Sequence, residues 1–262
     1  MRRAVFFLAL AYLVSAASAL PSGRNTYALR GKTQDIYYLP AEGAAKPEAV
    51  LFMPGDAGWT GYAVEMANRI AALGYNVYGF DVKTYLTGFT GTTTLSEAEM
   101  AEDLRAMAVW IHAQSGQPVV LAGWSQGANM ALLAGSASKN TNFCRGVLAI
   151  GLGDRAVLGW RFADNFTYFT KQEPNEPMFS AYEHLRTLSP YPLMMISSSH
   201  DEYVPTEVTK SLIDSAREPK RLVTIEAKNH RFSGKRDEFY QAIEDGLEWI
   251  HARSAELAGR PR

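Results

Sequence analysis

A serine between two glycines is the first candidate for chemistry in this sequence. Residues 123–127 read Gly-Trp-Ser-Gln-Gly, directly after the apolar run 118–122 and directly before the helix-like run 128–133. This order predicts a strand that turns sharply into a helix at Ser125, where the glycines leave room for the turn. The N–H groups at the start of the helix would then face charge that develops on a substrate oxygen. Ser125 is therefore a candidate nucleophile.

A serine nucleophile needs a base to take its proton and a carboxylate to orient that base. The apolar run 193–197 leads into a loop that carries Asp201, and the alternating run 222–226 leads into a loop that carries His230. We therefore expect Asp201 to be the acid and His230 the base. An isolated loop histidine is usually only a solvated surface residue, but chain order and strand context favour catalysis here.

The other histidines do not form a cluster with the spacing of a metal site. Serine chemistry of this kind also needs no organic group, so we expect neither a metal nor a cofactor. Glu202 and His200 flank Asp201 in the same loop. The loop pattern favours Asp201 as the acid and leaves both neighbours outside the catalytic set.

Composition indicates one globular domain. The chain has 262 residues, of which 47% are hydrophobic, and a net charge of −1. This length can bury one sizeable core, and the near-neutral charge lacks the basic footprint that nucleic acids require. We expect no nucleic-acid partner, and the oligomeric state stays open.

The N-terminus predicts export. Arg2 and Arg3 precede the apolar stretch 4–14, and small residues at 17 and 19 fit a cleavage site. We therefore expect a signal peptide over residues 1–19 and a mature domain over residues 20–262, periplasmic or secreted. An uncleaved membrane anchor is the alternative. The single cysteine, Cys144, excludes a disulfide framework and is expected as a small apolar residue at a strand start.

Strands and helices alternate along the rest of the chain. Strands are expected at 35–39, 49–53, 76–80, 118–122, around 148, 193–197 and 222–226, and helices at 62–73, 96–112, 128–133, 206–215 and 236–253. Ser96 and Glu99 form a capping-box pattern at one helix start. The alternation predicts an α/β fold, a mostly parallel sheet with helices on both faces. Ligands bind such sheets at the carboxyl ends of the strands, where Ser125, Asp201 and His230 fall.

These residues, in this order, resemble the α/β-hydrolase fold over about residues 33–250. The resemblance implies an oxyanion hole made by the backbone N–H of Gln126 and by a second N–H from the loop 53–59. Enzymes of this fold often carry His-Gly at the start of that loop, whereas this chain has Pro-Gly at residues 54 and 55. We choose Asp56 as the second donor, with Ala57 as the alternative.

A narrower resemblance is to the exported bacterial virulence proteins of the VirJ/AcvB family. Residues 55–59 read Gly-Asp-Ala-Gly-Trp where that family has Gly-Asp-Gly-Gly-Trp. The chain also departs from the family at Trp124, where a tyrosine is usual, and at Asn129, where an aspartate is usual. The resemblance implies a periplasmic serine hydrolase, with an aminoacyl phospholipid such as lysyl-phosphatidylglycerol as a candidate ester substrate.

Three residues near the expected nucleophile could contact that substrate. We expect Trp59 and Trp124 to bind it. A carboxylate at Asp56 opposes the negative charge of a tetrahedral intermediate, so its side chain should point away or meet a cationic group such as the amine of an aminoacyl ester. The alternative is that Asp56 braces its own loop through backbone hydrogen bonds.

Two long segments between predicted elements could shape the pocket. Residues 153–189 are dense in aromatic side chains, which predicts either a lid or acyl-binding wall, or a crossover whose aromatics fill the core. Residues 82–95 are expected to form a second long loop, whose Lys83 could reach an anionic head group. A transient contact with a membrane surface would follow from a lipid substrate.

The residues together predict two-step acyl transfer through Ser125, His230 and Asp201. A peptidase or a lipase would use the same residues, so sequence does not separate these classes from an esterase. A non-catalytic exported binding or assembly protein on a hydrolase scaffold is the remaining alternative.

Overall fold

The computed structural model describes residues 20–91, 94–139, 141–161 and 175–258. The predicted signal peptide, residues 1–19, lies outside the described residues. None of the helices formed by the described residues is long and apolar enough to cross a membrane.

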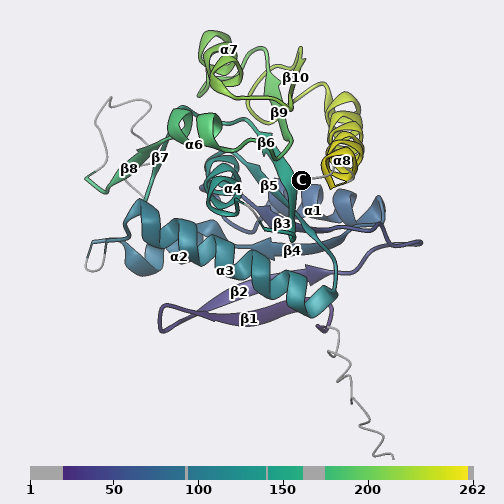
Figure 1. Cartoon of the computed structure of the whole chain (residues 1–262). Helices are drawn as coiled ribbons and strands as arrows, with labels where there is room; N and C mark the ends of the chain where they lie inside the picture. Colours follow the sequence, from purple (N-terminus) through teal and green to yellow (C-terminus); the bar gives the residue numbers. More distant parts are fainter. Residues whose placement is uncertain (1–19, 92–93, 140, 162–174, 259–262) are drawn as a thin grey trace, which may run out of the picture.

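The centre of the fold is an eight-stranded sheet in the order β1-β2-β4-β3-β5-β6-β9-β10 (Figure 1). Its strands are β1 (Gly23–Leu29), β2 (Lys32–Leu39), β3 (Ala49–Met53), β4 (Asn76–Phe80), β5 (Val119–Trp124), β6 (Cys144–Ile150), β9 (Leu193–Ser198) and β10 (Lys220–Ile225). Strands β1, β2 and β4 pair antiparallel, and all pairs from β4 to β10 are parallel. The predicted α/β fold with a mostly parallel sheet is confirmed.

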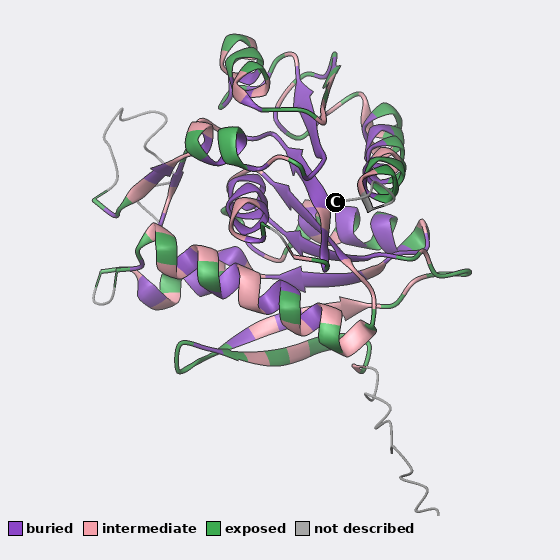
Figure 2. Cartoon of the chain, viewed as in Figure 1, coloured by how far each residue is buried: buried purple, intermediate pink, exposed green. Residues whose placement is uncertain are grey.

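Helices cover both faces of this sheet. They are α1 (Gly61–Ala72), α2 (Val82–Phe89), α3 (Glu97–Ser115), α4 (Gln126–Ala137), α6 (Ala181–Thr187), α7 (Thr206–Ser215) and α8 (Arg236–Ala258). Residues of α1 and α8 share one core cluster, and residues of the other helices share the second (Figure 1). The central strands are buried almost throughout, whereas β1 and the outer helix faces are exposed (Figure 2).

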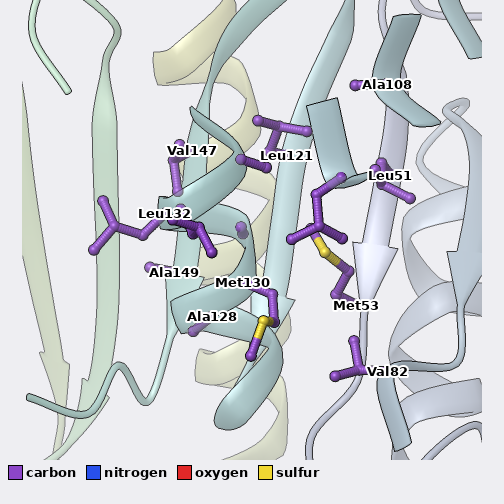
Figure 3. Packing of buried hydrophobic residues seen from close by; sticks show 14 of the residues in the cluster. Leu51, Met53, Val82, Ala108, Leu121, Ala128, Met130, Leu132, Val147 and Ala149 are labelled. Atoms are coloured by element: carbon purple, nitrogen blue, oxygen red, sulfur yellow. The ribbon is translucent and has the colours of Figure 1, made fainter. Parts of the chain in front are cut away.

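The two cores arise from the alternation of side chains along each strand. In β3, Leu51 and Met53 pack into the cluster of α3 and α4, whereas Val50 and Phe52 pack into that of α1 and α8. Figure 3 shows the first cluster, where Leu121 of β5 lies among side chains of β3 and α4. Strands that are apolar on both faces explain the continuous hydrophobic runs in the sequence.

The order of strands creates a switch point at the middle of the sheet. The chain goes from β3 to β4 on one side, and then crosses back to β5 on the other side of β3. Ligands of such sheets bind at a switch point of this kind, at the carboxyl ends of the strands. Residues 53–59 and Ser125 lie at the ends of β3 and β5.

The expectation of a long loop over residues 82–95 is wrong in its first half, because residues 82–89 form helix α2. The Asp81 carboxylate caps this helix by accepting the Thr84 N–H at 3.2 Å. The helix buries Val82, Tyr85, Leu86 and Phe89. Their spacing of three and four residues is the helical signal that the loop expectation overlooked.

Residues 153–189 contain two short strands and one helix in their described part. Strands β7 (Arg155–Val157) and β8 (Met178–Ser180) pair antiparallel, and α6 follows directly. Phe179 is buried in the core, while Trp160 and Tyr182 are partly buried against it. Residues 162–174 lie outside the described residues, so a lid over 153–189 stays a prediction.

Cys144 begins β6 and is buried, as its place in the sequence predicts. Burial raises the pKa of its thiol to about 12, because the interior disfavours the thiolate.

The capping box at the start of α3 allows a stability test. The Ser96 hydroxyl accepts the Glu99 N–H at 3.2 Å, and the Glu99 carboxylate accepts the Ser96 N–H at 2.9 Å. Ser96→Ala should lower the free energy of unfolding by about 1 kcal/mol in urea denaturation, because one helix N–H loses its partner. Ser96→Thr keeps the hydroxyl that accepts the Glu99 N–H and donates to the Glu99 carboxylate, and should stay near wild type. Equal losses in both variants would contradict the capping role.

Candidate active site

Ser125 sits in a strained backbone conformation between β5 and α4, with φ 58° and ψ −126°. Non-glycine residues rarely adopt positive φ, and such strain persists only where the surroundings enforce it. Here the Ser125 N–H donates to the Ile150 carbonyl at 2.8 Å, which ties the turn to the end of β6. The predicted strand-to-helix turn is therefore present, and it presents Ser125 at the start of α4.

The glycines beside Ser125 are required by close contacts between backbones. A Cβ on Gly123 would lie 2.0 Å from the Gly127 carbonyl oxygen, and a Cβ on Gly127 would lie 2.0 Å from that of Met53. On the facing loop, a Cβ on Gly55 would lie 2.9 Å from the Ser125 Cβ. The loop after β3 thus passes directly beside the nucleophile.

Asp201 and His230 form a short, buried hydrogen bond. His230 Nδ1 lies 2.6 Å from Asp201 Oδ2, and the two side chains are 5% and 1% exposed. The other carboxylate oxygen, Oδ1, accepts the N–H groups of Tyr203 and Val204 at 2.9 and 3.0 Å. Because an ionised carboxylate only accepts, Nδ1 carries the imidazole proton and the lone pair of a neutral ring is on Nε2.

His230 Nε2 is buried and has no hydrogen-bond partner among the residues that the structure describes. An unsatisfied buried ring nitrogen is costly in a folded protein, and at a catalytic site the missing partner is a reacting group. No hydrogen bond joins Ser125 to His230 within the described residues, as is common in sites without substrate. The roles of Ser125, Asp201 and His230 stay predictions.

The end of β6 lies between Ser125 and His230. Gly151, with φ 61°, packs so close to the imidazole that a Cβ there would lie 2.5 Å from His230 Cε1. The preceding residue, Ile150, accepts the Ser125 N–H. Ile150 therefore contacts the serine and Gly151 contacts the histidine. Ser125 and His230 both lie after strand ends, as the sequence predicts.

Three further side chains fix the position of His230. The ring of Trp124 stacks on the imidazole, with centroids 5.5 Å apart and planes at 29°. The ring of Tyr203 meets it edge-on at 5.3 Å. Glu202 accepts the His230 backbone N–H at 2.7 Å. Sequence analysis placed Glu202 outside the catalytic set, and its observed role is to hold the loop of the histidine.

Trp124 and Trp59 are both packed against protein side chains. Trp124 is 6% exposed and meets Tyr62 edge-on at 5.1 Å. Trp59 stacks on Tyr37 at 4.7 Å and covers Gly79, where a Cβ would lie 2.0 Å from the indole. Trp124 thus lies beside the histidine rather than on an open surface, and the binding roles of both tryptophans stay predictions.

The two residues chosen for the oxyanion hole lie next to Ser125 in the chain and on the facing loop after β3. Gln126 is the first residue of α4, so its backbone N–H has no acceptor within the helix. Its side-chain amide donates to the Val157 carbonyl at 2.6 Å. Asp56 is exposed, and its carbonyl accepts the Trp160 indole N–H at 3.0 Å. Sequence reasoning missed this use of Trp160, for which the only signal was the density of aromatics in 153–189.

Tyr62 packs beside the site on Trp124. Burial raises the pKa of the Tyr62 hydroxyl, and the nearby Arg236 opposes that rise. Within the described residues, no group of three or more His, Cys, Asp or Glu side chains is placed to hold a metal ion.

Comparison with solved structures identifies the class of fold. An α/β hydrolase, GrgF from Penicillium sp. sh18, superposes with a TM-score of 0.66 at 15% identity over 90% of this chain and 100% of that chain. Est1E from Butyrivibrio proteoclasticus gives 0.65 at 14% identity over 88% and 100%. An alpha-beta serine hydrolase homologue from Coxiella burnetii gives 0.62 at 17% identity over 88% and 100%. The chain has the α/β-hydrolase fold.

The narrower resemblance is supported as well. Residues 48–156 match the model of the bacterial virulence protein (VirJ) family, a span that holds Ser125 and the loop after β3. The uncharacterized protein Rv2307c of Mycobacterium tuberculosis is 27% identical over 235 residues, which cover 87% of this chain and 80% of that protein. The uncharacterized protein YfhR of Escherichia coli O157:H7 is 26% identical over 214 residues, covering 77% and 69%.

The two bonds to Asp201 Oδ1 allow a test of the histidine tautomer. Because two backbone N–H groups hold Oδ1, Asp201→Asn should place its amide nitrogen opposite His230 Nδ1. A donor there forces Nδ1 to accept, so the proton of the neutral ring should move to Nε2.

Correlation NMR of the imidazole nitrogens can observe this change, with His230→Gln to assign the resonances. Asp214→Asn, which changes an exposed aspartate of α7, should leave the tautomer unchanged. The same tautomer in Asp201→Asn and wild type would contradict the orienting role of Asp201.

Proposed function

We propose that this chain is an exported serine hydrolase that cleaves a carboxylic ester through an acyl-enzyme. The proposal rests on one observation, the buried Asp201–His230 pair whose Nε2 is unpaired beside the strained turn at Ser125. The fold supports it, since solved structures with this fold include an alpha-beta serine hydrolase homologue from Coxiella burnetii and an esterase domain from Rhodothermus marinus. Export is supported by the predicted signal peptide and by the match to a family of bacterial virulence proteins.

The arrangement would act in two steps. The Ser125 Oγ attacks the ester carbonyl carbon while His230 Nε2 takes its proton, and the N–H of Gln126 with a second N–H from residues 56–57 stabilises the oxyanion. The C–O bond then breaks, and His230 returns the proton to the departing alcohol. Water repeats the sequence on the acyl-enzyme and releases the carboxylic acid and free Ser125. Asp201 stays ionised and stabilises the imidazolium.

The substrate that we favour is an aminoacyl ester, such as that of an aminoacylated phospholipid. Asp56 is exposed and follows Gly55, which lies directly beside Ser125. A carboxylate there attracts the free amine that an aminoacyl ester carries close to its carbonyl, and repels a carboxylate in the same place. The resemblance of residues 55–59 to the VirJ/AcvB family implies the same substrate class.

The first test uses a fluorophosphonate probe on the purified mature protein and on Ser125→Ala. We expect labelling of the wild type and its loss in the variant, because the probe reacts only with an activated serine. Turnover of a short ester panel should vanish in the variant as well. Ser215→Ala removes a hydroxyl at the end of α7 that donates to the Leu212 carbonyl of the same helix, and should label like wild type.

The panel also separates the alternatives. If the labelled, active protein prefers peptides to esters, it is a peptidase. If it prefers long-chain glycerides, it is a lipase. A folded wild-type protein that neither labels nor turns over any ester would overturn the enzyme proposal and leave the binding or assembly alternative.

The charge of Asp56 predicts substrate preference. Asp56→Asn should lower kcat/KM for aminoacyl esters by up to about fivefold, since an exposed ion pair contributes at most about 1 kcal/mol, and should leave neutral esters within about twofold. Asp214→Asn is the matched control for loss of a surface carboxylate. Equal effects on cationic and neutral esters would rule out the amine contact and favour a bracing role for Asp56.

A further inference from the structure

We propose that Trp160 is a positioning residue for the oxyanion hole, because its indole N–H fixes the direction of the Asp56–Ala57 peptide group beside Ser125. This inference rests on the proposed function. It adds a residue of the 153–189 segment to the apparatus that would stabilise the transition state.

The loop after β3 forms a tight turn over residues 55–58. The Gly58 N–H donates to the Gly55 carbonyl at 2.9 Å, so Asp56 and Ala57 are the two central residues of a β-turn. The central peptide of such a turn has two orientations that differ by a rotation of about 180°, and the rotation exchanges its C=O with its N–H. In the wrong orientation, a carbonyl oxygen would replace the Ala57 N–H beside the developing oxyanion and would repel it.

Trp160 holds the carbonyl of this central peptide. Its Nε1 donates to the Asp56 oxygen at 3.0 Å. Because a trans peptide is planar, its N–H points opposite to its C=O, so the bond to Asp56 also sets the direction of the Ala57 N–H. The bond from Gly58 acts in the same way on the preceding peptide and sets the direction of the Asp56 N–H. Each of the two candidate donor N–H groups is therefore oriented by a hydrogen bond to the carbonyl of its own peptide group.

The identity of residue 57 supports the same orientation. The rotated form of the turn needs positive φ at its third residue, which alanine disfavours and glycine permits. Among described non-glycine residues, positive φ occurs only at Arg30, Ser125 and Phe232, so Ala57 has the unrotated form. Ala57 and Trp160 therefore favour one turn conformation by independent means.

Helix α2 holds Trp160 in place. The Trp160 backbone N–H donates to Thr90 Oγ1 at 2.8 Å, and Lys83 Nζ lies 4.4 Å from the indole ring centroid. The stem of Lys83 also packs on the turn, where a Cβ on Gly58 would lie 3.2 Å from it. The lysine thus contacts the indole and the turn together, which is a packing role distinct from the head-group contact that its sequence position predicts.

The other proposed donor is tied to the same short stretch of chain. The Gln126 side chain donates to the Val157 carbonyl, three residues before Trp160. Beyond Trp160, Arg161 forms an ion pair with the buried Glu176, which also packs against Gly159. Residues 157–160 therefore link the turn at Asp56 to the start of α4.

The test compares Trp160→Phe, Ala57→Gly and the double variant on the best ester of the panel. Trp160→Phe keeps a six-membered aromatic ring beneath Lys83 and removes the five-membered ring of the indole with its N–H. We expect kcat to fall about tenfold with KM within about twofold, since losing a whole oxyanion donor costs roughly 10²- to 10³-fold. In the Ala57→Gly background, where the turn can rotate, the loss should exceed the product of the two single effects.

Tyr182→Phe is the matched control. It removes a hydrogen bond of the same segment, from Tyr182 to Ser211, that does not reach the turn. Its kcat and the circular dichroism of every variant should match wild type. Three results would overturn the positioning role: a kcat of Trp160→Phe equal to that of wild type, a raised KM at constant kcat, or a double-variant loss equal to the product of the two single losses. Labelling of the wild type by the fluorophosphonate would still support the hydrolase. A wild type that fluorophosphonate does not label would overturn the proposed function and this inference with it.

Discussion

The site depends on one steric constraint, the contact of three backbone segments without side chains between them. Gly123, Gly127 and the end of β3 approach so closely that a single added Cβ would lie 2.0 Å from a carbonyl oxygen. Only this approach lets Ser125 take its positive φ while its N–H reaches the end of β6. The backbone strain of this turn lies at Ser125. The surrounding sheet offsets its conformational free energy, because two apolar cores hold β3, β5 and β6 in register. A loosely packed sheet could not support such a turn.

Around this turn, acidic and aromatic side chains together fix the position of His230. Asp201 fixes the ring through Nδ1, Glu202 fixes the backbone of the same residue, and Trp124 and Tyr203 restrict the ring from its face and its edge. The carboxylate of Asp201 is itself fixed by backbone N–H groups of its own loop. Every contact to the imidazole is thus pre-formed except the one at Nε2, where the proton must move. This arrangement is typical of a preorganised base, which avoids reorganisation during the reaction.

Sequence predicted what is local or periodic, and failed where contacts join distant segments. Strands 49–53 and 76–80 and helix 206–215 have the bounds that their patterns predict, and the capping box at Ser96 is present. Helix α2 was missed because residues 82–95, with their threonine-rich end, suggested one long loop, although Asp81 and the apolar spacing carried the helical signal. Strand β1 was missed because only its hairpin partner gives its polar residues an extended form. The bond from Trp160 to Asp56 spans 104 residues, and no local pattern encodes it. The pairing of Asp201 with His230, by contrast, follows from the shared sheet edge of two strand ends.

The single cysteine has a consequence for how this molecule can be handled. Cys144 is 2% exposed, and its thiol stays protonated at any physiological pH. Only the thiolate reacts readily with oxidants or alkylating agents, so the native state is inert to both. Unfolding exposes the thiol and restores its ordinary acidity. Cys144 can therefore report on unfolding. The fraction of molecules whose thiol reacts with an alkylating agent measures the unfolded fraction, and the folded protein needs no added label.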